Sequence, residues 1–194
     1  LMPVLQAGIP VIQHVGFMAA PFPLQHFPQQ SNYRMAFASR EVRRLLMHQG
    51  YPVAAHPVVH PPLPSDVLPN PTQPANNATL RIGYCGLLMH SKGVHVLLDA
   101  CKKLKTSGAQ FELRLAGKPF SPAYDQALRR FVFENDLTSQ VHWRGFLELE
   151  ELTSFYQELD VLVFPSLHPE SFGMVVAEAM ACGVVPISSG VGGA

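Results

Sequence analysis

Two glutamates flank a short glycine-containing segment in the last quarter of the chain. Glu170 and Glu178 are separated by seven residues, and Ser171-Phe172-Gly173 directly follows the first of them. If a helix begins between them, its rise of about 1.5 Å per residue places the two carboxylates roughly 10 Å apart. Paired carboxylates that hydrolyse a glycosidic bond stand about 5 to 9.5 Å apart. The spacing therefore favours recognition of ligand hydroxyls over paired acid and base catalysis.

Each glutamate also has an ordinary structural interpretation. Taken alone, Glu170 could complement a helix dipole and Glu178 could be a solvated helix residue, because charged side chains are mostly exposed. The surroundings of Glu178 weaken that interpretation. Its neighbours in the sequence are apolar, and a carboxylate among them needs a partner: Val175, Val176, Ala177, Ala179 and Met180.

A buried strand is predicted just before this segment, over residues 160–165 with the apolar run 161–164, and a helix over residues 172–182. In open α/β folds, ligands bind at the carboxyl ends of parallel strands. A helix that starts there offers unpaired N–H groups and its positive dipole end to a phosphate or sugar oxygen. Gly173 would let the ligand approach the backbone closely.

A second loop with similar properties follows the strand predicted over residues 80–86. It begins at Gly86, and Ser91 is expected to cap a helix over residues 91–106. Lys92 could neutralise phosphate groups there, although an exposed lysine in a first helical turn is the ordinary alternative. The glycine spacing does not match a Walker loop.

The segment Glu170-x7-Glu178, with Ser171-Phe172-Gly173 and Ala179-Met180-Ala181-Cys182-Gly183, resembles the donor-site signature of retaining GT-B glycosyltransferases. The resemblance is to glycosyltransferase family 4 (group 1) in particular. It implies a hexosyltransferase-type enzyme that takes a UDP-, GDP- or ADP-sugar as substrate, without a metal or other cofactor. Glu178 would hold the ribose hydroxyls. Glu170 and the following backbone would hold the transferred sugar and the diphosphate: Phe172, Gly173, Met174 and Val175.

The same resemblance assigns further residues. Gly86 and Lys92 would bind the diphosphate, and His14 would lie at the interdomain cleft, where it would orient the sugar or contact the acceptor. His14 could equally be a surface histidine at a strand end. The chain departs from the family at Leu87, where relatives commonly have arginine. The departure motivates a noncatalytic nucleotide-sugar-binding or scaffold module as the alternative function.

Strands and helices are expected to alternate along most of the chain, which predicts an α/β fold with a Rossmann-like parallel sheet covered by helices on both faces. Ser39 is expected to cap a helix over residues 40–49 that follows a short strand. The remaining predicted elements are strands at 80–86, 111–117, 141–146, 160–165 and 184–188, and helices at 91–106, 123–135, 149–159 and 172–182.

By resemblance, the chain is a fragment of a two-domain enzyme. Residues 1–55 would end the acceptor-side domain, residues 56–79 would form a proline-rich linker, and residues 80–194 would form most of the donor-binding domain. The acceptor would be a sugar, a lipid or a small molecule. Relatives with lipid acceptors imply a cytoplasmic protein with peripheral membrane contact through the missing N-terminal part.

Composition excludes several other classes. Lys plus Arg equals Asp plus Glu at 14 each, so no global field selects nucleic acid or an anionic membrane. No strand is followed by G-x-G-x-x-G, which disfavours a dinucleotide-dependent oxidoreductase. His56 and His60 are four residues apart, but intervening and following prolines prevent a helix that would make them metal ligands. The three cysteines are expected to be buried, reduced thiols, and the aromatic side chains of Trp143 and Phe155 to pack in the core. By resemblance, the turns at Gly117-Lys118 and Gly145-Phe146 would lie near the nucleotide base. Phe146 could equally be a core residue, which is the more frequent place for a lone aromatic side chain beside a strand.

Overall fold

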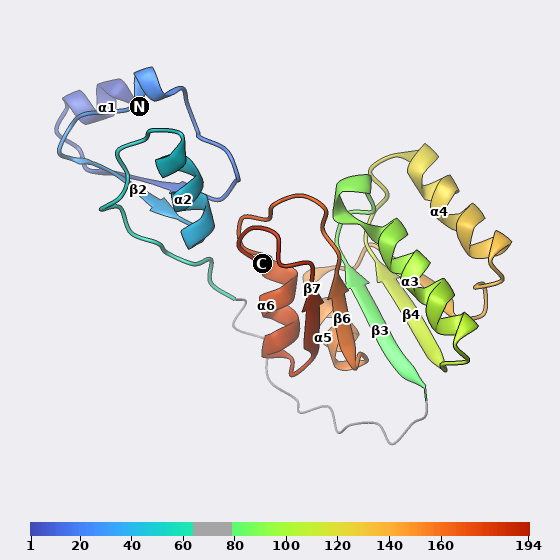
Figure 1. Cartoon of the computed structure of the whole chain (residues 1–194). Helices are drawn as coiled ribbons and strands as arrows, with labels where there is room; N and C mark the ends of the chain where they lie inside the picture. Colours follow the sequence, from blue (N-terminus) through green and yellow to red (C-terminus); the bar gives the residue numbers. More distant parts are fainter. Residues whose placement is uncertain (64–78) are drawn as a thin grey trace. The chain divides into compact units, whose positions relative to one another are not determined.

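The computed structural model describes residues 1–63 and 79–194. The predicted linker over residues 56–79 lies mostly outside the described residues. The chain divides into two units (Figure 1). The first contains residues 1–62, 169–173 and 190–194, and the second contains residues 63–168 and 174–189. Each is described by itself.

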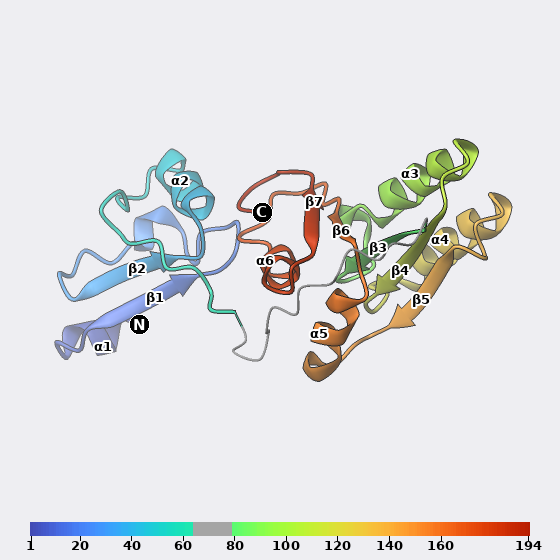
Figure 2. The same cartoon turned by 90° about the horizontal axis from the view of Figure 1, so that it is seen from below.

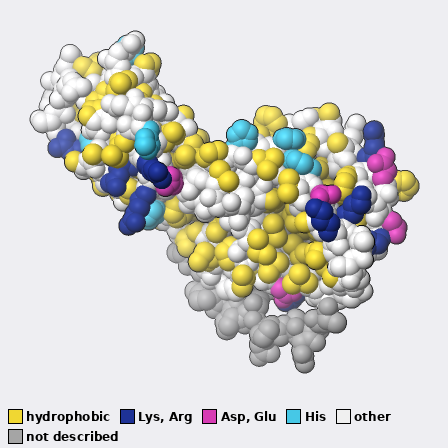
Figure 3. Space-filling model, in the orientation of Figure 1, with side chains coloured by type: hydrophobic (Ala, Val, Ile, Leu, Met, Phe, Trp, Pro, Cys, Tyr) yellow, Lys and Arg dark blue, Asp and Glu magenta, His cyan; other side chains and the backbone are white. Residues whose placement is uncertain are grey.

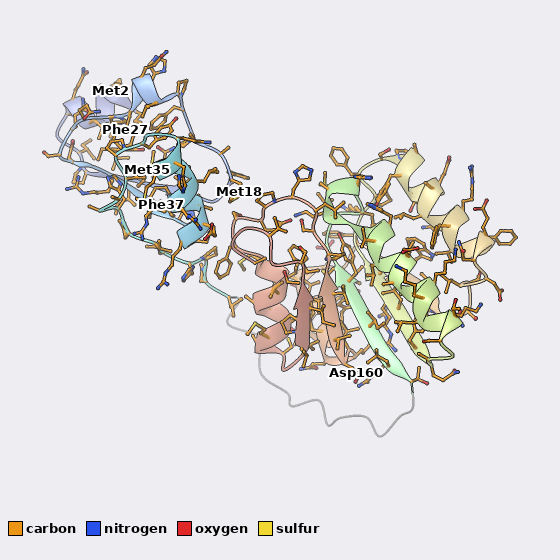
Figure 4. All side chains as sticks on the ribbon, viewed as in Figure 1. Met2, Met18, Phe27, Met35, Phe37 and Asp160 are labelled. Atoms are coloured by element: carbon orange, nitrogen blue, oxygen red, sulfur yellow. The ribbon has the colours of Figure 1, made fainter. Side chains whose placement is uncertain are left out.

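The first unit is built around two parallel strands, β1 (Val11–Val15) and β2 (Tyr33–Phe37). Its helices are α1 (Met2–Gln6), the 3-10 turn η1 (Leu24–His26) and α2 (Arg40–His48). The Ser39 Oγ accepts a hydrogen bond from the Val42 N–H at 3.3 Å, which confirms the predicted cap. Figure 4 marks Phe27, Met35 and Phe37 among the side chains that pack between these elements.

The second unit contains a five-stranded parallel sheet in the order β5-β4-β3-β6-β7 (Figure 2). Its strands are β3 (Leu80–Cys85), β4 (Phe111–Ala116), β5 (Val141–Gly145), β6 (Val161–Phe164) and β7 (Val185–Ser188). The chain moves outward from β3 to β4 and β5, and then returns to the other side of β3 for β6 and β7. The strand order therefore reverses between β3 and β6.

Helices cover both faces of this sheet, as predicted. α3 (Val94–Thr106) and α4 (Pro122–Glu134) pack on one face, and α5 (Leu149–Gln157) and α6 (Met174–Ala181) pack on the other. Successive strand residues point to opposite faces. Thus Leu115 joins the core beneath α3 and α4, whereas its neighbour Ala116 joins the core beneath α5 and α6.

An apolar hollow of about 580 Å³ lies on the first of these faces, next to α3. Figure 3 shows apolar side chains gathered over this part of the second unit. The residues that line the hollow include Ile82, Leu97, Val161, Val163 and Ile187.

Two predicted helices begin later than expected. The segment predicted to open with Ser91 forms instead a 3-10 turn, η2 (His90–Lys92), and α3 starts only after Gly93. Ser91 therefore does not cap α3, because the residue at the cap position is Gly93 with a φ of 71°. Likewise α6 begins at Met174, so Phe172 and Gly173 belong to the preceding loop.

Not every aromatic side chain has the predicted burial. Phe155 is buried and Trp143 packs partly buried against the core, as predicted. The core interpretation of Phe146 is wrong: its side chain is 52% exposed, and the Lys118 Nζ lies 4.1 Å from its ring centroid. Phe146 follows the end of β5, beyond the last core layer of the sheet. In the described part of the chain, no helix has both the length and the apolar character needed to cross a membrane.

Candidate functional site

The reversal of strand order places the loops after β3 and β6 next to each other at the carboxyl edge of the sheet. Both strands pair directly, with Gly83 opposite Leu162. In α/β sheets such a switch point is where ligands bind. The predicted site residues Gly86 and Lys92 lie in the β3 loop, and the predicted Glu170 lies in the β6 loop.

The loop after β3 is held tightly against the loop after β4. The Gly86 N–H donates to the Ala116 carbonyl at 3.0 Å, and the buried Tyr84 hydroxyl donates to the Leu87 carbonyl at 2.8 Å. At Gly117, φ is 145° and an added Cβ would lie 1.8 Å from the Gly86 oxygen. These two loops can therefore meet only because Gly117 lacks a side chain.

The other end of the β3 loop is fixed to the start of the β6 loop. An added Cβ at Gly93 would lie 2.0 Å from the Pro165 oxygen, and the Leu167 N–H donates to the Ser91 carbonyl at 2.8 Å. Lys92 lies between these two contacts. Its Nζ is 5.6 Å from the ring centroid of Phe164, the last residue of β6. The ammonium is thus close to the carboxyl end of β6.

Glu178 lies on α6 and has the partner that its apolar surroundings required. The Tyr156 hydroxyl of α5 donates to its Oε2 at 2.7 Å. Tyr156 is 1% exposed, and burial raises the pKa of its phenol far above the usual range. Cys85, the last residue of β3, packs against the same core cluster as Tyr156, and the Glu178 charge contributes to the raised pKa of its thiol.

Glu170 is half-buried and is held by its backbone. Its N–H donates to the Val191 carbonyl at 3.1 Å, and its carbonyl accepts from the Gly193 N–H at 2.7 Å. Glu170 also forms an isolated parallel bridge with Gly192, which has a φ of 88° and whose added Cβ would lie 2.4 Å from the Glu170 oxygen. Backbone hydrogen bonds therefore fix the position of the segment that carries Glu170.

The predicted site residues divide between the two units. The second unit contains five of them, Gly86, Lys92, Met174, Val175 and Glu178. Gly86 and Lys92 lie in the same loop, at the switch point. Those of the first unit are His14, Glu170, Phe172 and Gly173. His14 is exposed on β1, within the strand rather than after it, and its Nε2 lies 3.2 Å from the Val59 carbonyl oxygen.

Sequence reasoning missed two residues that shape this edge. Tyr156 was one of several aromatic residues in a predicted helix, and nothing in the sequence shows that it meets a helix that begins 18 residues later. Ser166 is 1% exposed, and its carbonyl accepts from the Ser189 Oγ at 2.7 Å. That bond ties the β6 loop to the residue after β7.

The cysteine thiols are reduced, as predicted, and unsuited to nucleophilic attack. Cys85, Cys101 and Cys182 are free, and the last two are buried. Burial raises the pKa of Cys85 to about 11 and that of Cys101 to about 12. A thiol reacts through its thiolate, so these side chains stay protonated and unreactive at neutral pH.

Comparison with known proteins extends this description. Residues 71–194 match the family described as glycosyl transferases group 1. The chain is 35% identical over 112 residues to a 2-deoxystreptamine glucosyltransferase of Streptomyces kanamyceticus. The aligned residues cover 58% of this chain and 28% of that protein. The chain is 34% identical over 116 residues to a D-inositol 3-phosphate glycosyltransferase of Corynebacterium urealyticum, with 58% and 27% covered.

The fold is shared with solved glycosyltransferase structures. Anabaena HepE in complex with UDP and glucose matches with a TM-score of 0.78 at 20% identity, over 98% of this chain and 55% of that one. The C-terminal domain of the group 1 protein LpcC from Francisella tularensis matches with a TM-score of 0.51 at 26% identity, over 61% and 67%. These matches confirm the predicted α/β fold of the GT-B type.

The chain spans about a quarter to a third of the length of the curated relatives reported above. The family match nevertheless includes every strand from β3 to β7 and both candidate glutamates. The chain therefore belongs to the group 1 glycosyl transferases.

Proposed function

We propose that this chain carries the donor site of a family 4 enzyme, which moves a hexose from a nucleoside diphosphate sugar to an acceptor hydroxyl with retention at the anomeric carbon. The observation that carries the proposal is the position of Lys92 at the switch point, between two backbone contacts that fix its loop. HepE has been crystallised with UDP and with UDP-glucose, which favours UDP as the donor nucleotide.

Each site residue has a proposed role in that reaction. Lys92 and the backbone at the start of α6 stabilise the negative charge that develops on the diphosphate as the glycosidic bond breaks. Glu178 accepts hydrogen bonds from the ribose hydroxyls, and Glu170 orients the transferred sugar. The acceptor hydroxyl attacks the anomeric carbon from the face that the diphosphate leaves, through an oxocarbenium-like state. No protein nucleophile is needed in this scheme.

The domain assignment is part of the proposal. Residues 1–55 would belong to the acceptor-side domain and residues 80–194 to the donor-binding domain, with residues 56–79 as the linker. His14 would then contact the donor sugar or the acceptor. The relatives act on different acceptors by name, including an aminocyclitol and an inositol phosphate. We therefore propose a hydroxyl-bearing small molecule, sugar or lipid as the acceptor class.

Replacement of Lys92 tests the proposal. A charge-assisted hydrogen bond contributes about 1.5 to 3 kcal/mol, so Lys92→Gln should weaken UDP-glucose binding about 10- to 150-fold in calorimetric titration. Lys103→Gln is the matched control. Lys103 is an exposed lysine in the last turn of α3, the helix that follows Lys92, and its ammonium lies 3.1 Å from the Asp99 carboxylate. Equal affinity of the Lys92 variant and the wild type would refute the role.

The noncatalytic alternative is favoured by one observation. Leu87 is 47% exposed in the loop that would face the diphosphate, where an arginine would add a second cation. Leu87→Arg separates the two functions. If the chain is a binding module that has lost activity, the substitution should strengthen UDP-glucose binding without producing measurable donor hydrolysis. If the rest of the catalytic site is intact, hydrolysis should rise together with affinity.

A further inference from the structure

Tyr156 contributes a buried hydroxyl to a short chain of polar groups between α5, α6 and the end of β3. The ring is fully buried beside Phe155, and its hydroxyl lies 2.7 Å from the Glu178 Oε2. The side chain of Cys85, at the end of β3, packs against the same core cluster as Tyr156. Three side chains from three elements thus meet below the switch point.

The protons in this chain have one consistent arrangement. A tyrosine hydroxyl has one proton to donate and can also accept, whereas an ionised carboxylate only accepts. The phenol proton therefore goes to Glu178. The Cys85 thiol keeps its proton, since burial raises its pKa to about 11. If the Tyr156 hydroxyl rotated away from Glu178, it would lose its charge-assisted hydrogen bond to the carboxylate.

One oxygen of Glu178 remains available to a ligand. In the part of the chain that the structure describes, the hydrogen bond of the Glu178 carboxylate is the one to Tyr156, through Oε2. Within the same residues, the buried side-chain atoms without a partner are Gln30 Oε1 and Asp125 Oδ1. The Glu178 Oε1 is not one of these atoms, so it keeps some exposure to solvent. A charge-assisted bond to Oε2 fixes the rotation of the carboxylate and so the direction in which Oε1 points.

We propose that Tyr156 is a positioning residue that orients Glu178 for the ribose hydroxyls and thereby makes the site select ribonucleotides over 2′-deoxyribonucleotides. This inference rests on the proposed function, in which Glu178 binds the ribose. A carboxylate held in one orientation accepts hydrogen bonds at fixed positions, whereas a rotating one must be ordered by each ligand at an entropic cost. A site built to bind a ligand hydroxyl also rejects an analogue that lacks this hydroxyl, because the polar group of the protein that would bind it stays unpaired.

The test compares UDP with 2′-deoxy-UDP on the full protein. For the wild type we expect about tenfold or greater preference for UDP in calorimetric titration, as one charge-assisted hydrogen bond is gained. Tyr156→Phe removes the hydroxyl and keeps the ring. It should reduce the preference to about threefold or less by weakening UDP binding while 2′-deoxy-UDP binding stays unchanged.

Tyr124→Phe is the matched control. Tyr124 is a half-buried tyrosine of the same unit whose hydroxyl lies 2.8 Å from the His95 Nδ1, and its loss should leave the preference unchanged. A general loosening of the fold would weaken both nucleotides equally, so the ratio separates positioning from stability. If Tyr156→Phe does not fold, Glu178→Asp withdraws the carboxylate from Tyr156 and should lose the same preference.

Each remaining outcome has one meaning. A wild type that binds both nucleotides equally contradicts the role of Glu178 and with it the proposed function. A wild type that prefers UDP, together with a Tyr156→Phe variant that keeps the full preference, overturns the positioning role and leaves the proposed function standing. A Glu178→Asp variant with undiminished preference would overturn it as well.

Discussion

Gly93 occupies the point where the loops after β3 and β6 meet, and replacing it with alanine tests how that edge is held together. Its φ of 71° lies in the left-handed region, and its added Cβ would lie 2.0 Å from the Pro165 oxygen and 2.9 Å from the Pro165 carbonyl carbon. Both atoms belong to the backbone, so the clash cannot be relieved by turning a side chain. The loop as a whole must move.

The size of the effect follows from four contributions. Left-handed backbone costs a residue with a Cβ about 1–2 kcal/mol. Moving the loop also weakens the hydrogen bond from the Leu167 N–H to the Ser91 carbonyl, at about 1 kcal/mol. The steric strain itself costs about 1–3 kcal/mol. Alanine makes the unfolded chain less flexible, which returns about 0.4–1 kcal/mol, so we expect Gly93→Ala to lower the free energy of unfolding by about 2–5 kcal/mol.

Gly108 provides the control at the other end of α3. Its φ is 80°, but no atom lies within 4 Å of its added Cβ. Gly108→Ala should therefore lower the free energy of unfolding only through the backbone conformation, by about 0.5–1 kcal/mol. Trp143 is the one tryptophan of the chain and lies in β5, so its fluorescence in urea reports the unfolding of the second unit. Equal destabilisation by the two substitutions would refute the contact between Gly93 and Pro165.

Two further predictions concern ionisable groups. The Asp160 Oδ1 lies 2.7 Å from the Arg81 Nη2 at the amino end of the sheet (Figure 4), and the Arg81 guanidinium lowers the pKa of Asp160. The ion pair therefore stabilises the folded state at pH values above the usual Asp pKa near 3.8. That stabilisation is lost as the pH falls through the lower pKa of the folded state. Asp160→Asn should cost about 1–3 kcal/mol of unfolding free energy in urea at neutral pH and progressively less in acid; a pH-independent difference would contradict this. Burial lowers the pKa of His56, whose Nδ1 accepts a hydrogen bond from the Met35 N–H at 2.8 Å. Protonating His56 therefore costs more in the folded state than in the unfolded one, and the first unit should lose stability as the pH falls from 6.5 through the pKa of folded His56. Proton NMR titration should place the pKa of His56 below 6.5, and a value above 6.5 would contradict that burial.

The strand and helix pattern of the second unit could be read from the sequence because each strand is a short apolar run between turn residues. Every predicted strand of this unit ends within two residues of the observed one. The two late helix starts have a common cause. Gly93 and Gly173 both have a positive φ, 71° and 81°, and a residue in that conformation interrupts a helix. Sequence alone identifies the glycine but not the sign of its φ.

The site was predictable only in part for a similar reason. A recognisable spacing picked out Glu178, and its apolar neighbours required that it have a partner. The identity of that partner depended on how α5 and α6 pack on one face of the sheet, which brings Tyr156 to the carboxylate. The exposure of Phe146 likewise depends on how far β5 extends, and no local signal in the sequence sets that end.

The most direct test of the proposed donor site is a thermal unfolding measurement with UDP-glucose on the wild type and on Glu178→Gln. A ligand that binds only the folded state raises the melting temperature, and at a concentration 100 times Kd the stabilisation is about 2.7 kcal/mol. We expect a clear rise in the wild type and little or none in the variant. GDP-glucose and ADP-glucose serve as the comparison for the base. An equal rise in the wild type and the variant would contradict the assignment of Glu178, and the absence of a rise with any of the three would contradict the donor site itself.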